Sequence, residues 1–366
     1  MGLETWYVAI FTAAALAALP LVLLAESLGK RLGLVDRPRP GEAQRHVVPR
    51  TGGYGLFVAF WLVVGASFLF APADLERLPA DTLRVLGVFL GSLVLLPLAA
   101  LDDSRRLGPV PQLLGQIVAA TIPAFFGLRM EEVASPWGIL SIPEPLRVAL
   151  AVFWIVAMIN AINLVDTMDG LAGGVTALAC WVLFLRTAWF DQASIAVLPL
   201  ALGGACVGFL TRNWHPSKVF LGSSGSLLLG YLLGVITVIG GAKIGTAFLV
   251  LAVPILDVAW VSYRRLSQGR SPLKGGDAQH LPHQLRQMGM GDRQIVLALY
   301  AVCAATGVAI LSLHSTLPRA EKTYLAAAVV VGVLGALAGV ARINAQRAAT
   351  HAGSPPPAQP SSSERN

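Results

Sequence analysis

Charged residues are scarce in this chain. Only 13% of its 366 residues are Asp, Glu, Lys or Arg, whereas soluble globular domains average about 25%. Hydrophobic residues make up 55% of the sequence, and the mean hydropathy is +0.68. This composition excludes a disordered chain, a collagen-like chain and a coiled coil, and it disfavours a soluble globular enzyme.

Cysteine is scarce as well. The three cysteines, Cys180, Cys206 and Cys303, are odd in number, widely spaced and embedded in apolar runs. This pattern excludes a disulfide framework and a cysteine-rich zinc site, so we expect all three to be packing residues.

Long uncharged apolar runs, in contrast, occur along most of the chain. Eleven of them could cross a bilayer, which takes about 20 helical residues: 5–25, 51–73, 85–101, 107–128, 148–165, 170–185, 192–211, 219–242, 244–263, 294–318 and 323–341. The sequence therefore predicts an all-α polytopic membrane protein with about 11 transmembrane helices. Residues 1–345 would form one membrane domain, and residues 346–366, which end in a Pro- and Ser-rich stretch, a disordered cytoplasmic tail.

The distribution of positive charge predicts how these helices are oriented. With eleven spans, 19 of the 27 Lys and Arg residues fall on one side, in loops 26–50, 102–106, 212–218 and 264–293 and in the tail. The positive-inside rule makes that side cytoplasmic, with the N-terminus outside and the C-terminus inside. We thus expect a multi-pass protein of the inner (cytoplasmic) membrane. The net charge of +7 then reflects a face near anionic lipid headgroups, and a nucleic-acid partner is not expected.

Polar residues gather in the loops on the predicted cytoplasmic side. In Arg45–Gly53, the glycines could let backbone amides approach a ligand and the cations could hold phosphate, although a solvated basic loop explains these residues as well. Asp102 and Asp103 directly follow an apolar run, which suits a divalent metal, a cationic partner or proton abstraction; an ion-paired turn with the following arginines is the alternative.

The stretch Asn160–Gly174 carries two amides and two acids between two apolar runs. If it is helical, Asn163, Asp166 and Gly170 share one face, and Asp169 lies one turn from Asp166. Ordinary lipid-facing sequence does not have this composition. The stretch is therefore the strongest indication of a functional site.

Two further segments complete the set. Gly222-Ser223-Ser224-Gly225-Ser226 opens an apolar helix and could offer free amides to an anion, or it could serve as a serine N-cap with small-residue packing. His280 and His283 lie in the long loop 264–293, where Pro282 argues against a regular helix. Metal binding, phosphate contact and proton transfer are all open for these histidines.

The order and spacing of these segments resemble the polyprenyl-phosphate N-acetylhexosamine-1-phosphate transferases of glycosyltransferase family 4. This family includes the undecaprenyl-phosphate N-acetylglucosamine-1-phosphate transferases and the phospho-N-acetylmuramoyl-pentapeptide transferases. Asn160–Gly174 is close to the family pattern N-x-x-N-L-x-D-G-x-D-G-L-A-x-G, and Arg45–Gly53 ends in the family's P-R-x-G-G. Leu101–Leu107 with Gln116 resembles its paired-aspartate motif, and Pro254–Asp257 also matches.

The resemblance implies a reaction and a set of site residues. A polyprenyl phosphate in the membrane would attack the β-phosphate of a UDP-amino-sugar, most simply UDP-GlcNAc, and release UMP as a first step of a cell-envelope polysaccharide pathway. The implied cofactor is Mg²⁺, with Mn²⁺ as the alternative, and a homodimer is left open. The implied catalytic residues are Asp102, Asp103, Asp166, Asp169, His280 and His283; the substrate-binding residues are Arg45, His46, Arg50, Gly52, Gly53, Asn160, Gly222 and Ser224; the metal residues are Asn163 and Asp166, with Ser223 at a position where the family has Asp.

Two departures from the family pattern define alternative functions. Ser223 replaces the acid of G-D-x-G-S, and Pro282 replaces the central histidine of H-x-H-H. A hydroxyl is a poorer Mg²⁺ ligand than a carboxylate, so one alternative is a catalytically impaired relative that binds polyprenyl phosphate or a partner enzyme. A transporter is a third hypothesis, but the polar residues cluster at one face and not at the midplane.

Overall fold

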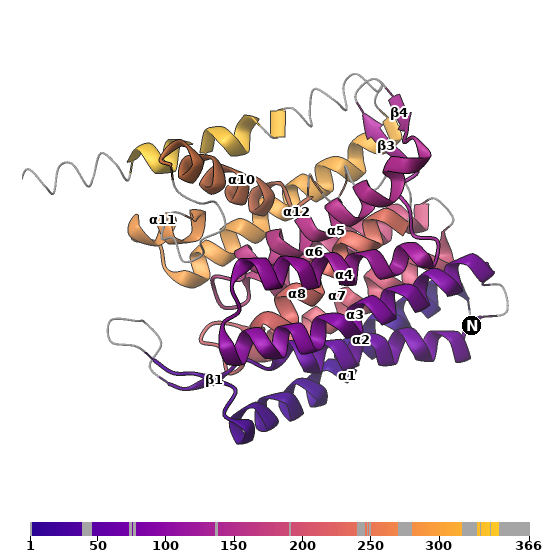
Figure 1. Ribbon diagram of the computed structural model, residues 1–366, viewed down its shortest axis with the longest axis horizontal. Helices are drawn as coiled ribbons and strands as arrows, with labels where there is room; N and C mark the ends of the chain where they lie inside the picture. The colour runs from indigo at the N-terminus through magenta and orange to yellow at the C-terminus, as the bar shows by residue number, and fades with distance from the viewer. Residues whose placement is uncertain are drawn as a thin grey trace, which may run out of the picture.

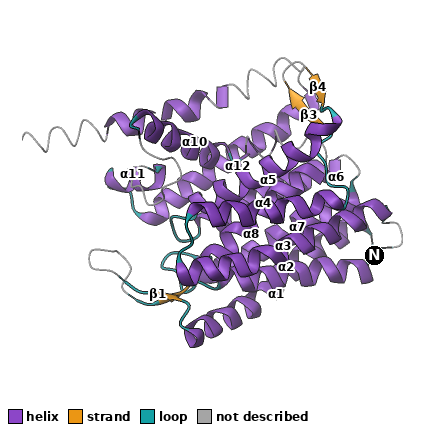
Figure 2. Cartoon of the chain, in the orientation of Figure 1, coloured by secondary structure: helices purple, strands orange, loops and turns teal. Residues whose placement is uncertain are grey.

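The computed structural model describes most of the chain. The described residues are 2–38, 46–72, 75, 78–135, 138–189, 192–239, 246, 248, 250–269, 280–316, 328–329, 331–336 and 338–343. Nearly all of them are helical (Figure 2), as the composition predicts. The predicted tail 346–366 and residues 323–327, 330 and 337 of the apolar run 323–341 lie outside the described residues.

The helices follow the predicted apolar runs in order. They are α1 (Leu3–Leu32), α2 (Gly52–Leu69), α3 (Pro79–Arg105), α4 (Pro109–Phe125), α5 (Glu144–Val165), α6 (Leu171–Trp189), α7 (Ala193–Asn213), α8 (Gly222–Ile239), α10 (Ala252–Ser267), the short α11 (Leu281–Gln287) and α12 (Asp292–Thr316). Within the described residues, eight helices are long and apolar enough to cross a membrane: α1, α2, α3, α5, α6, α7, α8 and α12. Helices α4 and α10 overlap predicted runs but have only 17 and 16 residues. The chain is thus a polytopic membrane protein.

Helices α7 and α8 form the centre of the bundle. Almost every residue of α8 is buried, including the large side chain of Tyr231, which is fully enclosed. Helix α1 packs on α7 and α2, α5 packs on α8, and α3 packs on α4 and α8 (Figure 1). The outer helices expose leucines such as Leu16 and Leu86. In a bilayer such side chains face lipid, so their exposure is favourable.

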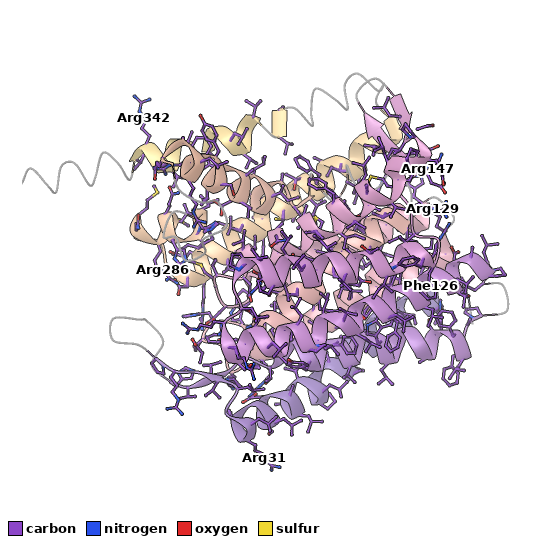
Figure 3. The ribbon with its side chains drawn as sticks, viewed as in Figure 1. Arg31, Phe126, Arg129, Arg147, Arg286 and Arg342 are labelled. Atoms are coloured by element: carbon purple, nitrogen blue, oxygen red, sulfur yellow. The ribbon has the colours of Figure 1, made fainter. Side chains whose placement is uncertain are left out.

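The two short strand pairs lie at opposite ends of the bundle (Figure 2). β1 (Val35–Asp36) pairs antiparallel with β2 (Val48–Pro49), and β3 (Glu132–Ser135) pairs antiparallel with β4 (Gly138–Ser141). Figure 3 shows Arg31 and Arg286 at the end that carries β1, and Arg129 and Arg147 at the other end. Because α3, α5 and α7 end where α4, α6 and α8 begin, the segments joining them meet at the β1 end.

All three cysteines are free and buried. The prediction that they are packing residues is therefore confirmed.

Candidate active site

A polar cleft of about 420 Å³ opens at the β1 end of the bundle. It brings together residues that are more than 180 positions apart in the sequence, since the loops of α1, α3, α5, α7 and their successors converge there. Its lining residues are Asp36, Arg50, Asp102, Asn163, Asp166, Thr167, Met168, Asp169, Asn213, Phe220, Leu221, Gly222, Ser223 and Ser226. Four of the five polar segments predicted from the sequence thus contribute to one cavity.

The paired aspartates at the end of α3 are held by the start of α8. The Ser223 amide donates to Asp103 Oδ1 at 3.1 Å, and the Ser223 hydroxyl donates to Asp102 Oδ2 at 2.6 Å. Asp102 Oδ1 also accepts from the Leu107 amide at 2.9 Å and from Gln112 Nε2 at 2.5 Å. Carboxylates are unfavourable at the C-terminus of their own helix, but the positive N-terminus of α8 compensates them. In the Gly/Ser turn, the amide of Ser223 is thus bonded to the Asp103 carboxylate.

Gly222 permits this contact. Its φ of +70° lies in the left-handed region, and a Cβ at this position would lie 2.1 Å from the Arg50 carbonyl oxygen and 3.2 Å from Asp103 Oδ2. Any side chain would separate α8 from both partners. Asp103 Oδ2 is buried and has no hydrogen-bond partner among the described residues, so this oxygen is in place to receive a proton or a cation.

The segment after α5 forms the wall opposite the paired aspartates. Asn163, in the last turn of α5, donates through Nδ2 to Ser226 Oγ at 2.8 Å. The helix ends at Val165, so the stretch is not helical through Gly170, and the condition for one shared helical face is not met. A turn over residues 166–170 follows, with Gly170 at φ +79°, and α6 begins at Leu171. This break lets Asp166 and Asp169 both line the cleft.

Asp169 is fixed by a segment that the sequence analysis did not single out. Its Oδ2 accepts from the Ser217 amide at 3.1 Å and contacts His215 Nδ1 at 2.8 Å, while its Oδ1 accepts from the Ser217 hydroxyl at 2.9 Å. Asn213 Oδ1 accepts from the Gly170 amide at 2.9 Å. The signal was present, since Asn213–Ser217 is a polar segment directly after the apolar run 192–211.

Burial and the charges around the cleft together change the acidity of Asp166. Burial raises the pKa of this carboxyl group to about 7; the negative charges of Asp103 and Asp169 also raise it, and Arg50 opposes them. Bringing several carboxylates around one cavity is unfavourable unless a cation offsets their charge. Among the described residues, Arg50 is the one arginine or lysine in the cleft lining.

Gly52 and Gly53 have a different role from the predicted ligand binding. Their amides donate to the carbonyl oxygens of Phe220 and Leu221 at 3.0 and 2.9 Å, so they are not available to a ligand. A Cβ on Gly53 would lie 2.0 Å from the Gly225 amide nitrogen. These glycines therefore let α2 pack directly against the start of α8.

Several predicted site residues do not line the cleft. His280 is buried and bonded through Nδ1 to Asp257 Oδ2 at 3.0 Å. His283 is nearby, and burial together with the charges of Arg286 and His280 lowers the pKa of its imidazole. Residues Asp257 and Pro282 line a separate small cavity that shares Thr167 with the cleft. The histidines are thus neighbours of the cleft.

The remaining predicted binding residues are Asn160, His46, Ser224 and Arg45, and none of them is in the cleft lining among the described residues. Asn160 lies one turn before Asn163 and donates to Gln116 Oε1 at 2.6 Å, which ties α5 to α4. His46 contacts the Ser217 carbonyl oxygen at 3.3 Å, and Ser224 is buried at the start of α8. Arg45 lies outside the described residues.

The donor set fits a magnesium ion that is bound together with phosphates. Within the described part of the chain, no three His, Cys, Asp or Glu side chains are placed to hold a metal alone. Mg²⁺ commonly uses one or two carboxylates and completes its octahedron with substrate phosphates and water. Two side chains in the cleft provide such a partial set: the Asp166 carboxylate and the side-chain oxygen of Asn163. The Asn163 nitrogen is already bonded to Ser226, so its oxygen is the atom that remains for a metal.

Comparisons with known proteins agree with this arrangement. The profile described as Glycosyl transferase family 4 matches residues 85–241, which cover most of α3 and all of α4 to α8. The chain is 32% identical to a decaprenyl-phosphate N-acetylglucosaminephosphotransferase of Mycobacterium tuberculosis (strain ATCC 25618 / H37Rv) over 307 residues, 75% of this chain and 74% of that protein. It is 28% identical to a probable undecaprenyl-phosphate N-acetylglucosaminyl 1-phosphate transferase of Bacillus subtilis (strain 168) over 305 residues, 80% of each chain. It is also 28% identical to the undecaprenyl-phosphate alpha-N-acetylglucosaminyl 1-phosphate transferase of Escherichia coli (strain K12) over 321 residues, 80% of each.

Proposed function

Since the chain belongs to glycosyl transferase family 4, we propose that it transfers N-acetylglucosamine 1-phosphate from UDP-N-acetylglucosamine to a polyprenyl phosphate. The observation that carries the proposal is the cleft. Asp102, Asn163 and Asp166 meet Arg50 there, at one end of an apolar helical bundle. A site at the end of a membrane bundle can receive a lipid phosphate from the bilayer and a nucleotide from water at the same time.

The reaction joins two anions. An oxygen of the lipid phosphate attacks the β-phosphorus of the UDP-sugar, a new P–O bond forms, and the bond from that phosphorus to the bridging oxygen breaks, so UMP leaves. Arg50 offsets the charge of the two phosphates in the cleft. The buried, unpartnered Oδ2 of Asp103 is in place to accept the proton of a singly ionised lipid phosphate.

The other carboxylates are oriented for separate tasks. Asp169, held by His215 and Ser217, lines the cleft with a fixed orientation. Asp166 and Asn163 would hold Mg²⁺, which when bound offsets the charge of the phosphates and of the leaving UMP. Asp102 accepts from Ser223 at the start of α8 and from Gln112 on α4, so it keeps α3 aligned with both helices.

The topology forms part of the proposal. We place the cleft on the cytoplasmic face of the inner membrane, with eleven spans, the N-terminus outside and the C-terminus inside. The excess of Lys and Arg in the loops at that end supports this orientation.

Transfer by the purified protein tests the function. The protein is incubated with undecaprenyl phosphate, Mg²⁺ and one of several radiolabelled UDP-sugars, and lipid-linked product and UMP are measured. We expect UDP-N-acetylglucosamine to give both products in equal amounts. Product from a different UDP-sugar would correct the donor, whereas binding of the lipid without transfer from any donor would identify a catalytically impaired relative.

A further inference from the structure

Helix α12 packs on α6 and brings Tyr300 to the turn that joins α5 to α6. The Tyr300 hydroxyl donates to the Gly170 carbonyl oxygen at 2.5 Å. Its ring lies close against α6, since a Cβ on Gly174 would overlap the hydroxyl oxygen. Tyr300 lies outside residues 85–241, which the family profile matches, and among the described residues it is not one that lines the cleft. It therefore contacts the catalytic turn from outside the cleft.

The backbone of Gly170 is fixed on both sides. Its amide donates to Asn213 Oδ1 at 2.9 Å, and its carbonyl oxygen accepts from the Gly174 amide at 2.9 Å as well as from Tyr300. Because the Gly174 amide already satisfies this carbonyl, the Tyr300 hydroxyl is not needed to prevent an unpaired acceptor. Its bond instead fixes the direction in which the chain leaves Asp169.

The ring of Tyr300 supports the other partner of Asp169. The rings of Tyr300 and Trp214 lie 6.3 Å apart between centroids and are tilted by 52°. Trp214 directly precedes His215, whose Nδ1 contacts Asp169 Oδ2 at 2.8 Å. One side chain thus contacts both the turn that carries Asp169 and the segment that binds its carboxylate.

We propose that Tyr300 is a positioning residue for the transfer reaction, because it holds Asp166 and Asp169 in the orientation that transfer requires. The inference rests on the proposed function. The turn over 166–170 has no regular secondary structure, so side chains from neighbouring elements must fix it. Reacting and catalytic groups work only near their productive geometry, and a displacement of about 1 Å can cost about 100-fold in rate. Loss of one bond to this turn should therefore affect kcat more than stability.

Two Tyr→Phe variants test this role. Tyr300→Phe keeps the ring and removes the hydroxyl. Tyr231→Phe is the matched control, since the buried Tyr231 hydroxyl on α8 donates to the Val88 carbonyl oxygen at 3.1 Å, about 21 Å along α3 from Asp102. Each variant loses one bond from tyrosine to a backbone carbonyl, so both melting temperatures should fall by similar small amounts.

The kinetic constants should differ between the two variants. We expect kcat of Tyr300→Phe to fall about tenfold, with KM for undecaprenyl phosphate within about twofold, because the proposed phosphate partners Arg50 and Asp103 are not on this turn. Tyr231→Phe should keep kcat within about twofold of the unmodified protein.

The outcomes separate this inference from the proposed function. If the unmodified protein transfers sugar phosphate and the two variants keep kcat, or lose it equally, the inference is overturned and the function stands. If the unmodified protein transfers nothing, the function fails, and hydrogen–deuterium exchange without substrates still tests whether Tyr300 holds the turn. Faster exchange over residues 166–174 in Tyr300→Phe but not in Tyr231→Phe supports this anchoring, whereas equal exchange in both variants overturns it.

Discussion

At the scale of single residues, Ser223 joins the paired aspartates to α8. Its hydroxyl and its amide donate to different carboxylates, Asp102 and Asp103. Ser223 thus stabilises, through its hydroxyl and its amide, a pair of negative charges that a bound cation could also stabilise.

Ser223→Asp should therefore make the protein more dependent on Mg²⁺. The change removes a donor and adds a third carboxylate next to Asp102 and Asp103, so repulsion lowers the thermal stability in EDTA. Because Mg²⁺ affinity rises with the number of charged oxygen ligands, we expect the Mg²⁺ concentration for half-maximal transfer to fall about fivefold. A Mg²⁺ titration of transfer measures this. Ser223→Ala is the control, since we expect it to lower activity without changing the Mg²⁺ concentration for half-maximal transfer. If that concentration is also unchanged in a folded Ser223→Asp protein, the account is refuted.

The clamp on Asp169 is the second testable feature at this scale. His215→Ala removes one of three hydrogen bonds to this carboxylate, and hydrogen bonds to charged groups contribute about 1.5–3 kcal/mol. We expect kcat to fall at least about tenfold with little change in thermal stability. Arg293→Gln serves as the matched control, since Arg293, at an exposed position, donates to the His215 carbonyl oxygen and not to Asp169. Equal losses in both variants would show that the segment is merely structural.

At the scale of the helices, an ion pair fixes the cleft end of α1 to α7. Glu26 is 6% exposed and accepts from Arg212 Nη2 at 2.7 Å and from Lys30 Nζ at 2.7 Å. Glu26→Gln leaves the Arg212 guanidinium without its counter-charge, so we expect a loss of about 1–3 kcal/mol in unfolding free energy. Lys30→Gln removes an exposed partner and should cost less than about 1 kcal/mol. Thermal melting in detergent compares the two, and equal destabilisation would contradict this division.

The contact between α2 and α8 gives a matched pair of glycine variants within one helix. A Cβ on Gly53 would meet the backbone of Gly225 at 2.0 Å, whereas a Cβ on Gly65 meets nothing within 4 Å. Gly53→Ala should thus cost several kcal/mol or prevent folding, and Gly65→Ala should stabilise by up to about 1 kcal/mol. Folded yield and melting temperature measure both. A Gly53→Ala protein as stable as the Gly65→Ala protein would show that the two helices separate easily.

At the scale of the whole molecule, the proposed topology predicts which positions are accessible from each side. In a background with Cys180, Cys206 and Cys303 replaced by Ala, Arg105→Cys at the cleft end should react with a membrane-impermeant maleimide only after the membrane is opened. Arg129→Cys, which is exposed near the other end, should react in intact cells. The reverse pattern would invert the orientation.

The sequence determined the class of this molecule, and the folded chain determined the site. Apolar runs of helical length leave a membrane bundle as the stable solution, because backbone polar groups in lipid must bond internally. The local pattern also identified Asp102, Asn163, Asp166 and Asp169, since such side chains are costly beside apolar runs without a function. It did not reveal that Ser223 binds both aspartates, that the Gly52 and Gly53 amides are occupied, or that His215 and Ser217 hold Asp169. Those contacts join segments about 45 to 170 residues apart, and only the packing of α7 and α8 against their neighbours brings them within hydrogen-bond distance.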